Sequence, residues 1–186
     1  MTSIRQKIVR SAMLAVAIMV SHTTLAQHLA VKTNLIYDAL LTPSLGAEFV
    51  VGKHCSLDVM STYNRFGNDS KKWRNYSFQP ELRWWPHRSM TGPFLGISGV
   101  AGGFNLKGIN IFDYKGQHRQ GHFYGGGISV GWHQILSTHF SLEYKIGGSF
   151  VCADYERIEN NAIASKGTTN RILPIGTGIS LVYVIK

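Results

Sequence analysis

The sequence lacks an apolar run long enough to cross a bilayer as a helix. Its best candidate, residues 11–20, falls well short of the about 20 apolar residues that a membrane-spanning helix needs. No later stretch of the chain comes closer. This absence argues against a helical membrane protein.

Cysteine is equally scarce, with Cys55 and Cys152 the only two in the chain. Neither follows the early apolar run directly, so attachment of a lipid to a processed N-terminal cysteine has no acceptor. In an exported protein two cysteines are by default read as a disulfide. The strand arrangement argued below predicts instead that both remain free.

Charge is sparse and unbalanced, whereas glycine and aromatic residues are plentiful. Charged residues make up 16% of the chain and aromatic residues 11%, and there are 20 glycines. This composition favours a protein built from many strands over a helical one.

The first 26 residues have the features of a cleaved signal peptide. Arg5, Lys7 and Arg10 precede the apolar run, and Ala26 is a small residue suited to cleavage. We therefore expect a signal peptide over residues 1–26 and one domain over residues 27–186. Removal of those three basic residues lowers the net charge from +9 to +6, because residues 1–26 contain no acid. An exported chain of this modest charge is not expected to bind nucleic acid.

Period-two alternation of apolar and polar residues predicts about eight strands. They are residues 28–37, 44–51, 55–63, 76–85, 93–104, 122–132, 140–151 and 172–185. Short breaks follow the second, fourth and sixth strands, and longer polar breaks follow the third, fifth and seventh, at residues 64–75, 105–121 and 152–171. Short turns at one end and long loops at the other predict an all-β, eight-stranded antiparallel up-and-down transmembrane β-barrel of the outer membrane, without an amphipathic helix.

Each predicted strand that carries charge separates its charged residues from its large apolar ones. Within residues 76–85, Glu81 and Arg83 alternate with Leu82 and Trp84. A soluble barrel would turn the apolar face inward, whereas a membrane barrel turns it toward lipid, and the narrow lumen of eight strands favours the second arrangement. The charged face then encloses an ion-pair network formed by Lys32, Glu48, Asp58, Glu81, Arg83, Glu143 and Lys145. Solvated charges on the outside of a soluble barrel are the alternative interpretation.

Several aromatic residues fall near strand ends on the apolar face, where an interfacial girdle is expected. They are Tyr37, Tyr63, Tyr76, Trp84, Trp132, Tyr144 and Phe150. Pro80 lies inside a predicted strand, and the ladder hydrogen bond that it cannot donate predicts a local bulge.

The positions of the two cysteines follow from the same strand assignment. Cys55 begins a strand at the turn side, and Cys152 ends one at the loop side. A membrane-crossing strand separates these ends by about 25 Å, whereas a disulfide requires Cα atoms within about 7 Å. Two free thiols are predicted.

Three stretches resemble a known outer-membrane family. "KTNLIYDALLTPSLGAEF", "KKWRNYSFQPELRWW" and "GHFYGGGISVGWHQILSTHFSLEY" are similar to the family catalogued as domain of unknown function 3575, from Gram-negative bacteria of the Bacteroides type. The resemblance covers nearly all of the chain after residue 26. It implies an exported eight-stranded barrel, sometimes encoded near fimbrial genes, and it implies no catalytic residues.

Catalytic and metal-binding patterns are weak. His118 and His122 have no third ligand that the sequence places beside them, and no metal or cofactor is predicted. His139, Ser141 and Glu143 share a face and resemble the His-x-Ser element of lipid A deacylases, but they open a strand at the turn side, away from the outer leaflet. The glycine-rich stretches precede no helix and so do not predict a phosphate-binding loop.

The predicted function is that of a non-enzymatic integral outer-membrane protein with a lumen plugged by side chains. Its expected partners are outer-membrane lipid and lipopolysaccharide, and also surface or fimbrial proteins. Outer-loop recognition is assigned to Lys71, Lys72, Trp73, Arg74 and Lys107. The alternatives are a lipid A-modifying enzyme that uses Ser141 and His139, and a soluble periplasmic barrel that binds an apolar ligand.

Overall fold

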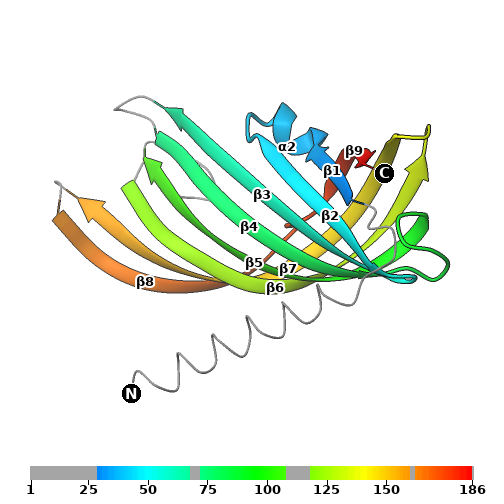
Figure 1. Ribbon diagram of the computed structural model, residues 1–186. Coiled ribbons are helices and arrows are strands. Elements are labelled where there is room, and N and C mark those ends of the chain that lie inside the picture. The colour runs from blue at the N-terminus through cyan, green and yellow to red at the C-terminus, as the bar shows by residue number, and fades with distance from the viewer. Residues whose placement is uncertain (1–28, 68–71, 108–117, 160–161, 186) are drawn as a thin grey trace, which may run out of the picture.

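The fold is an antiparallel β-barrel with one short helix (Figure 1). The computed structural model describes residues 29–67, 72–107, 118–159 and 162–185. Its elements are β1 (Leu29–Asn34), α2 (Leu35–Ala39), β2 (Ser44–Gly52), β3 (Cys55–Gly67), β4 (Lys72–Trp84), β5 (Gly92–Lys107), β6 (His118–Ile135), β7 (Phe140–Glu159), β8 (Ala162–Leu173) and β9 (Gly178–Ile185). No helix in these ranges is long and apolar enough to cross a membrane. The predicted signal peptide lies outside them.

Eight strands close into a ring. β1 to β7 pair in sequence order, β7 pairs with β9, and β9 pairs back with β1. The predicted all-β, eight-stranded antiparallel barrel is therefore confirmed. β8 is an additional strand, and in the described part of the chain it pairs only with β7.

The two ends of the barrel differ in construction. At the turn end, where β2 meets β3 and β6 meets β7, the ring is closed. At the opposite, loop end, β2 begins only at Ser44, opposite Thr62, whereas β3 continues to Gly67 beside β4. Above β1 and β2 the wall is thus a trough formed by β3 to β8, which Figure 1 shows with β3 and β8 at its two edges.

The first predicted strand is shorter than expected because a helix replaces its second half. The side chain of Asn34 accepts hydrogen bonds from the backbone N–H groups of Ile36 (3.1 Å) and Tyr37 (3.3 Å), which caps α2. Tyr37 therefore does not lie in a strand. Its hydroxyl accepts a hydrogen bond from the backbone N–H of Gly176 at 3.1 Å, which ties α2 to the segment before β9.

The predicted long loop over residues 152–171 is instead a hairpin of β7 and β8. The last predicted strand is also divided, since β8 ends at Leu173 and β9 begins at Gly178. Between them Gly176 has φ +85°, a left-handed conformation that glycine adopts without steric cost. The interruption lets the chain leave the edge of the trough and enter the closed ring.

Pro80 does not cause the predicted bulge. It lies opposite Val59 in an unbroken register with β3, and the register with β5 is the same before it, at Phe78 and Ala101, as after it, at Glu81 and Ser98. Only the ladder positions beside the proline are missing from the β4–β5 pairing. The absent N–H is thus accommodated by a local gap in hydrogen bonding.

Both cysteines are free, as predicted. Cys55 lies opposite Trp84 near the turn end of β3, and Cys152 lies opposite Tyr124 toward the loop end of β7. The length of the barrel wall separates them.

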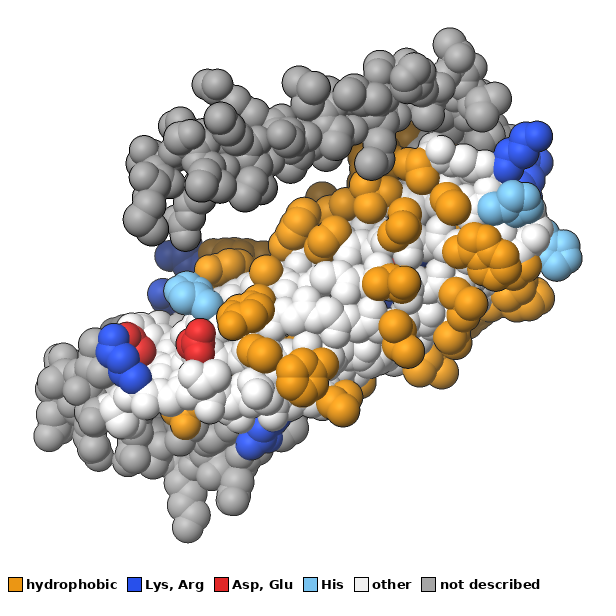
Figure 2. All heavy atoms as spheres, turned by 90° about the horizontal axis from the view of Figure 1, so that it is seen from below, with side chains coloured by type: hydrophobic (Ala, Val, Ile, Leu, Met, Phe, Trp, Pro, Cys, Tyr) orange, Lys and Arg blue, Asp and Glu red, His pale blue; other side chains and the backbone are white. Residues whose placement is uncertain are grey.

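The outside of the barrel is apolar along its middle. One cross-strand row joins Leu57, Leu82, Ile97 and Ile128, and these side chains are exposed, Ile97 and Ile128 at 70% and 72%. Figure 2 shows hydrophobic side chains spread over this face, with charged side chains and histidines near its two ends. We call the exposed apolar rows from the level of Trp84 to that of Tyr76 the apolar belt.

Candidate functional site

The alternation of side chains along the strands directs the charged residues into the lumen. The buried charged side chains are Lys32 from β1, Glu48 from β2, Asp58 from β3, Glu81 and Arg83 from β4, and Glu143 and Lys145 from β7. The structure thus brings together all seven residues of the expected network. We call them the lumen cluster.

Arg83 is the centre of the lumen cluster. Its Nη1 lies 2.8 Å from Glu48 Oε2 and its Nη2 lies 2.8 Å from Asp58 Oδ2. Its Nε donates to Glu81 Oε1 at 2.6 Å, and Nη1 and Nη2 donate to Glu143 at 2.7 and 3.0 Å. One guanidinium therefore binds carboxylates from four strands, a role that its fork of five fixed donors suits.

Two lysines complete the pairing of the four carboxylates. Lys32 Nζ lies 2.5 Å from Glu48, 2.9 Å from Glu143 and 3.1 Å from Asp58 Oδ1. Lys145 Nζ lies 3.2 Å from Glu81 Oε2, on the side of the cluster that faces the loop end. Three cations against four carboxylates make the cluster nearly neutral, so that each buried charge has a partner of opposite sign.

An aromatic layer closes the lumen below the cluster, toward the turn end. Trp85 and Phe94 are buried with ring centroids 4.8 Å apart, and the guanidinium of Arg83 lies 4.5 Å from the Phe94 centroid. The indole of Trp85 donates to Ser56 Oγ at 2.8 Å, and His133 meets the Trp85 ring edge-on. Sequence reasoning missed this layer, although Trp85 shares the lumen-facing parity of Arg83.

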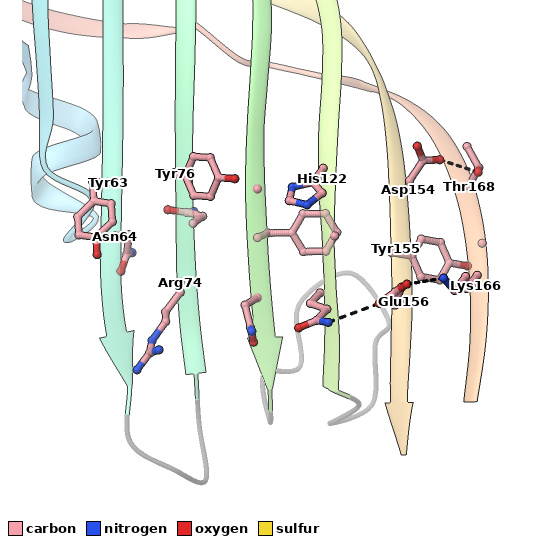
Figure 3. A pocket seen from close by; sticks show the side chains of 17 residues that line it. Tyr63, Asn64, Arg74, Tyr76, His122, Asp154, Tyr155, Glu156, Lys166 and Thr168 are labelled. Carbon is pink, nitrogen blue, oxygen red and sulfur yellow. Dashed lines mark hydrogen bonds and ion pairs between the residues drawn. The ribbon is translucent and has the colours of Figure 1, made fainter. Parts of the chain in front are cut away.

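A pocket opens at the loop end, on the trough. It has a volume of about 890 Å³ and is lined from β3, β4, β5, β6, β7 and β8 (Figure 3). A smaller pocket of about 300 Å³ lies against α2, where Tyr37 and Phe123 contribute to its lining. The two share Asn75, Tyr76 and Phe104, so they adjoin, and we call them together the loop-end pocket. Sequence reasoning did not identify this pocket. The periodicity of a strand shows which side chains share a face, but it does not show how the sheet curves around a cavity.

Polar residues replace the apolar belt on the outer face of the trough. One cross-strand row consists of Arg65, Arg74, Asn105, Gln120, Glu156 and Lys166. Lys166 Nζ lies 2.8 Å from Glu156 Oε1. The hydrogen bonds that Lys166 and Gln120 donate hold the pKa of the Glu156 carboxyl below its usual value. We call this row the polar collar.

The residues assigned to outer-loop recognition meet at the ends of β4 and β5. Lys72 lies opposite Lys107, and Trp73 lies next to Lys72 at the start of β4. Arg74 is exposed and contributes to the loop-end pocket. Lys71 lies outside the described residues. The backbone register therefore gathers four of the five positions at one side of the pocket.

The pair considered for catalysis is not assembled. His139 is exposed and its ring stacks on Tyr183, with centroids 5.8 Å apart. Ser141 is buried, and Glu143 is committed to the lumen cluster. Over the described ranges, no group of three or more His, Cys, Asp and Glu side chains is arranged to hold a metal ion.

Comparison with known proteins identifies a family and no characterised relative. A family model described as "Protein of unknown function (DUF3575)" matches residues 12–185. No curated protein and no solved structure matches the chain. The family therefore supplies no activity or ligand for this chain.

Proposed function

We propose that this chain, which belongs to the DUF3575 family, is a non-enzymatic integral outer-membrane β-barrel that presents an interaction site at the cell surface. The observation that carries the proposal is the orientation of the barrel wall. Its bulky apolar side chains are exposed, and its charged side chains are buried. A soluble barrel requires the reverse.

The apolar belt is too extensive for a protein surface in water. Soluble monomers rarely expose a contiguous apolar patch of more than a few hundred Å², whereas here Ile97 and Ile128 belong to rows that cross several strands. On β4 the belt covers nine residues from Tyr76 to Trp84, about 26 Å along the strand. Transmembrane barrels have strands tilted by about 35–45° and an apolar band about 25 Å tall. With that tilt the belt is about 20 Å high, close to the height of the band.

The closed lumen favours an anchoring role over a channel. The lumen cluster and the layer of Trp85 and Phe94 fill the ring where β1 and β9 close it. Eight strands leave little space beyond their own side chains. The barrel thus serves as a structural anchor in the envelope.

The trough projects beyond the belt and carries recognition. The polar collar lies one side-chain row above Tyr63 and Tyr76, where the chain leaves the apolar zone for water. We assign recognition of lipopolysaccharide, or of a surface partner such as a fimbrial protein, to the basic and aromatic residues expected from the sequence, Lys71, Lys72, Trp73, Arg74 and Lys107.

Membrane fractionation combined with heat-modifiable gel mobility tests the proposal. The full chain should be recovered in the outer membrane and should migrate differently before and after boiling, because a folded barrel resists detergent. Planar-bilayer recordings should show no large, stable conductance. Recovery in the soluble periplasm, without a mobility shift, would contradict the membrane assignment.

A further inference from the structure

The loop-end pocket has a regular construction. One inward-facing row crosses all six strands of the trough through directly opposed residues, namely Asn64, Asn75, Phe104, Gly121, Tyr155 and Gly167. Every member of this row lines the pocket. The row therefore has an amide half on β3 and β4 and an aromatic half on β5 to β8.

The next row toward the lumen repeats this division. Thr62 and Ser77 bring hydroxyl groups from β3 and β4, with their Oγ atoms 2.7 Å apart. Phe123 brings an aromatic ring from β6. All three contribute to the smaller pocket against α2. In both rows β3 and β4 thus present hydrogen-bonding groups, and the aromatic rings come from β5 to β7.

Glycines allow the aromatic rings to lie across the neighbouring strands. A Cβ atom on Gly167 would come within 2.8 Å of Tyr155 Cζ, and one on Gly102 within 2.5 Å of Phe123 Cζ. The rings therefore occupy space that any other residue would fill. Figure 3 shows the ring of Tyr155 lying from β7 toward β8.

A saccharide matches these two walls. A sugar ring has an apolar C–H face, which packs on an aromatic face, and hydroxyl groups at its edges, which side-chain amides bind as donors or acceptors. Asn75 Oδ1 is buried and has no hydrogen-bond partner in the part of the chain that the structure describes. An acyl chain would leave such polar groups unpaired, at a cost in binding free energy.

The arrangement favours a neutral ligand over a phosphorylated one. The inward row contains no charged residue. The charged residues that contribute to the pocket lie in outward-facing rows: Arg74 is exposed, and Lys166 pairs with Glu156 at 2.8 Å. Asp154 accepts a hydrogen bond from Thr168 Oγ1 at 2.7 Å.

We infer that the loop-end pocket binds a neutral saccharide, stacked on Tyr155 and Phe104 and hydrogen-bonded to Asn75. The larger of its two parts has a volume of about 890 Å³, within the usual range for small-molecule sites, about 300 to 1,000 Å³. The inference rests on the proposed function, because the pocket faces the cell exterior only if the apolar belt lies in the outer membrane. The sugar has two sources, the neutral hexoses of the cell's own lipopolysaccharide and glycans free in the surroundings.

Titration calorimetry of the full chain in detergent micelles tests the inference. The probes are maltohexaose, cellohexaose and mannohexaose, the core oligosaccharide released from lipopolysaccharide by mild acid and then dephosphorylated, and laurate as an apolar ligand. Saturable binding of the core oligosaccharide alone supports the cell's own membrane as the source. Binding of a free hexaose supports an external glycan. Laurate binding with no saccharide binding would overturn the inference, as would no binding at all.

Matched variants connect binding to the two walls. Tyr155→Ala and Asn75→Ala should each weaken saccharide binding by roughly tenfold, as expected for the loss of one aromatic contact or one hydrogen bond. Tyr124→Ala and Asn170→Ala, which remove the same side-chain types from the outer face of β6 and β8, should leave the Kd unchanged. Equal effects in both pairs would contradict the assigned site.

Heat-modifiable mobility, measured on every sample, separates failure of the site from failure of the barrel. If Tyr155→Ala does not fold, Tyr155→Leu keeps the bulk without the aromatic face and should weaken binding to a similar extent. A wild-type chain that folds as a barrel and binds no saccharide overturns the ligand alone. A wild-type chain that stays soluble overturns the membrane assignment, and the titrations still decide the pocket.

Discussion

Arg83 and Glu143, 60 residues apart in the sequence, meet in the lumen through two parallel hydrogen bonds, Nη1 to Oε2 at 2.7 Å and Nη2 to Oε1 at 3.0 Å. Such a bidentate pair fixes direction as well as distance. It joins β4 to β7 across the barrel, although the two strands are not neighbours in the sheet. The side chains therefore link opposite walls of the lumen in addition to the backbone ladder.

Removal of Arg83 should destabilise the barrel strongly. Arg83→Met leaves four buried carboxylates with only two lysines, and breaking a buried ion pair in this way costs about 3 to 5 kcal/mol. Denaturant unfolding in detergent, followed by the loss of heat-modifiable mobility, measures the effect. Arg74→Met, at an exposed position, is the control and should change stability little. Equal midpoints for the two variants would contradict the central role of Arg83.

The pair of Lys145 and Glu81 should show coupling in a double-mutant cycle. Lys145→Met removes one of the two cations that contact Glu81, and the single variant should be less stable than the wild type. Lys145→Met combined with Glu81→Gln removes both charges and should recover part of that loss, since no carboxylate is then left without its partner. Additive losses in unfolding free energy would show that the two side chains are not coupled.

Two glycines should respond differently to the same substitution. A Cβ atom on Gly96 would lie 2.4 Å from Ser129 Oγ and 2.9 Å from Glu81 Cδ, whereas one on Gly148 would meet nothing within 4 Å. Gly96→Ala should therefore cost about 1 to 3 kcal/mol by overpacking. Gly148→Ala should be neutral or slightly stabilising. Unfolding midpoints measure both, and a larger loss for Gly148→Ala would be incompatible with the lumen packing.

A lysine in the apolar belt should impair insertion, and one in the polar collar should not. Ile128 lies near the middle of the belt, where a lysine that faces lipid costs about 2 to 4 kcal/mol. Ile128→Lys should therefore fold into lipid vesicles with a lower unfolding free energy. Gln120→Lys lies on the same strand and face, in the collar, and should cost about 0 to 1 kcal/mol. Similar costs at both positions would argue against a membrane boundary between them.

Gel mobility after boiling should not depend on reductant. Cys55 and Cys152 are free and lie toward opposite ends of the wall, so no intramolecular disulfide can form in the folded chain. After denaturation both thiols should react with maleimide, giving a mass increase of two labels. Cys55→Ser, with Cys152 intact, should reduce that increase to one. A mobility shift caused by reductant alone would indicate a different strand order.

The faces of the strands could be predicted from the sequence, because alternation is strict wherever one side is apolar. Glu81 and Arg83 alternate with Leu82 and Trp84, and β4 has the same two faces in the structure. The pattern fades beyond the apolar belt. In β8, Lys166 and Thr168 face outward while Ser165 and Thr169 face inward, so both faces are polar and the segment reads as a loop.

Other features depend on local or tertiary contacts that no periodicity records. α2 forms where the side chain of Asn34 accepts hydrogen bonds from the N–H groups of Ile36 and Tyr37. In the sequence, apolar and polar residues alternate there as in a strand. The loop-end pocket requires the cross-strand register, since Asn75 and Tyr155 are brought into one row only by three successive pairings. The register of these strand pairs depends on the closure of the whole ring and cannot be read from any one strand.

β1 ends at Asn34 and β2 begins at Ser44, so neither strand reaches the loop end of the wall. The barrel is therefore a closed cylinder at the turn end and an open half-pipe at the loop end. In the described chain, the two margins of the half-pipe, β3 beyond Thr62 and β8, each hydrogen-bond to one neighbouring strand. Bending them apart or together would break none of the pairs between β1 and β9 that seal the cylinder. A change in the width of the mouth would therefore leave the seal beneath it intact, although hydrogen bonds from Tyr63 to Pro43 and from Asn64 to Thr42 fasten the β3 margin to the segment before β2.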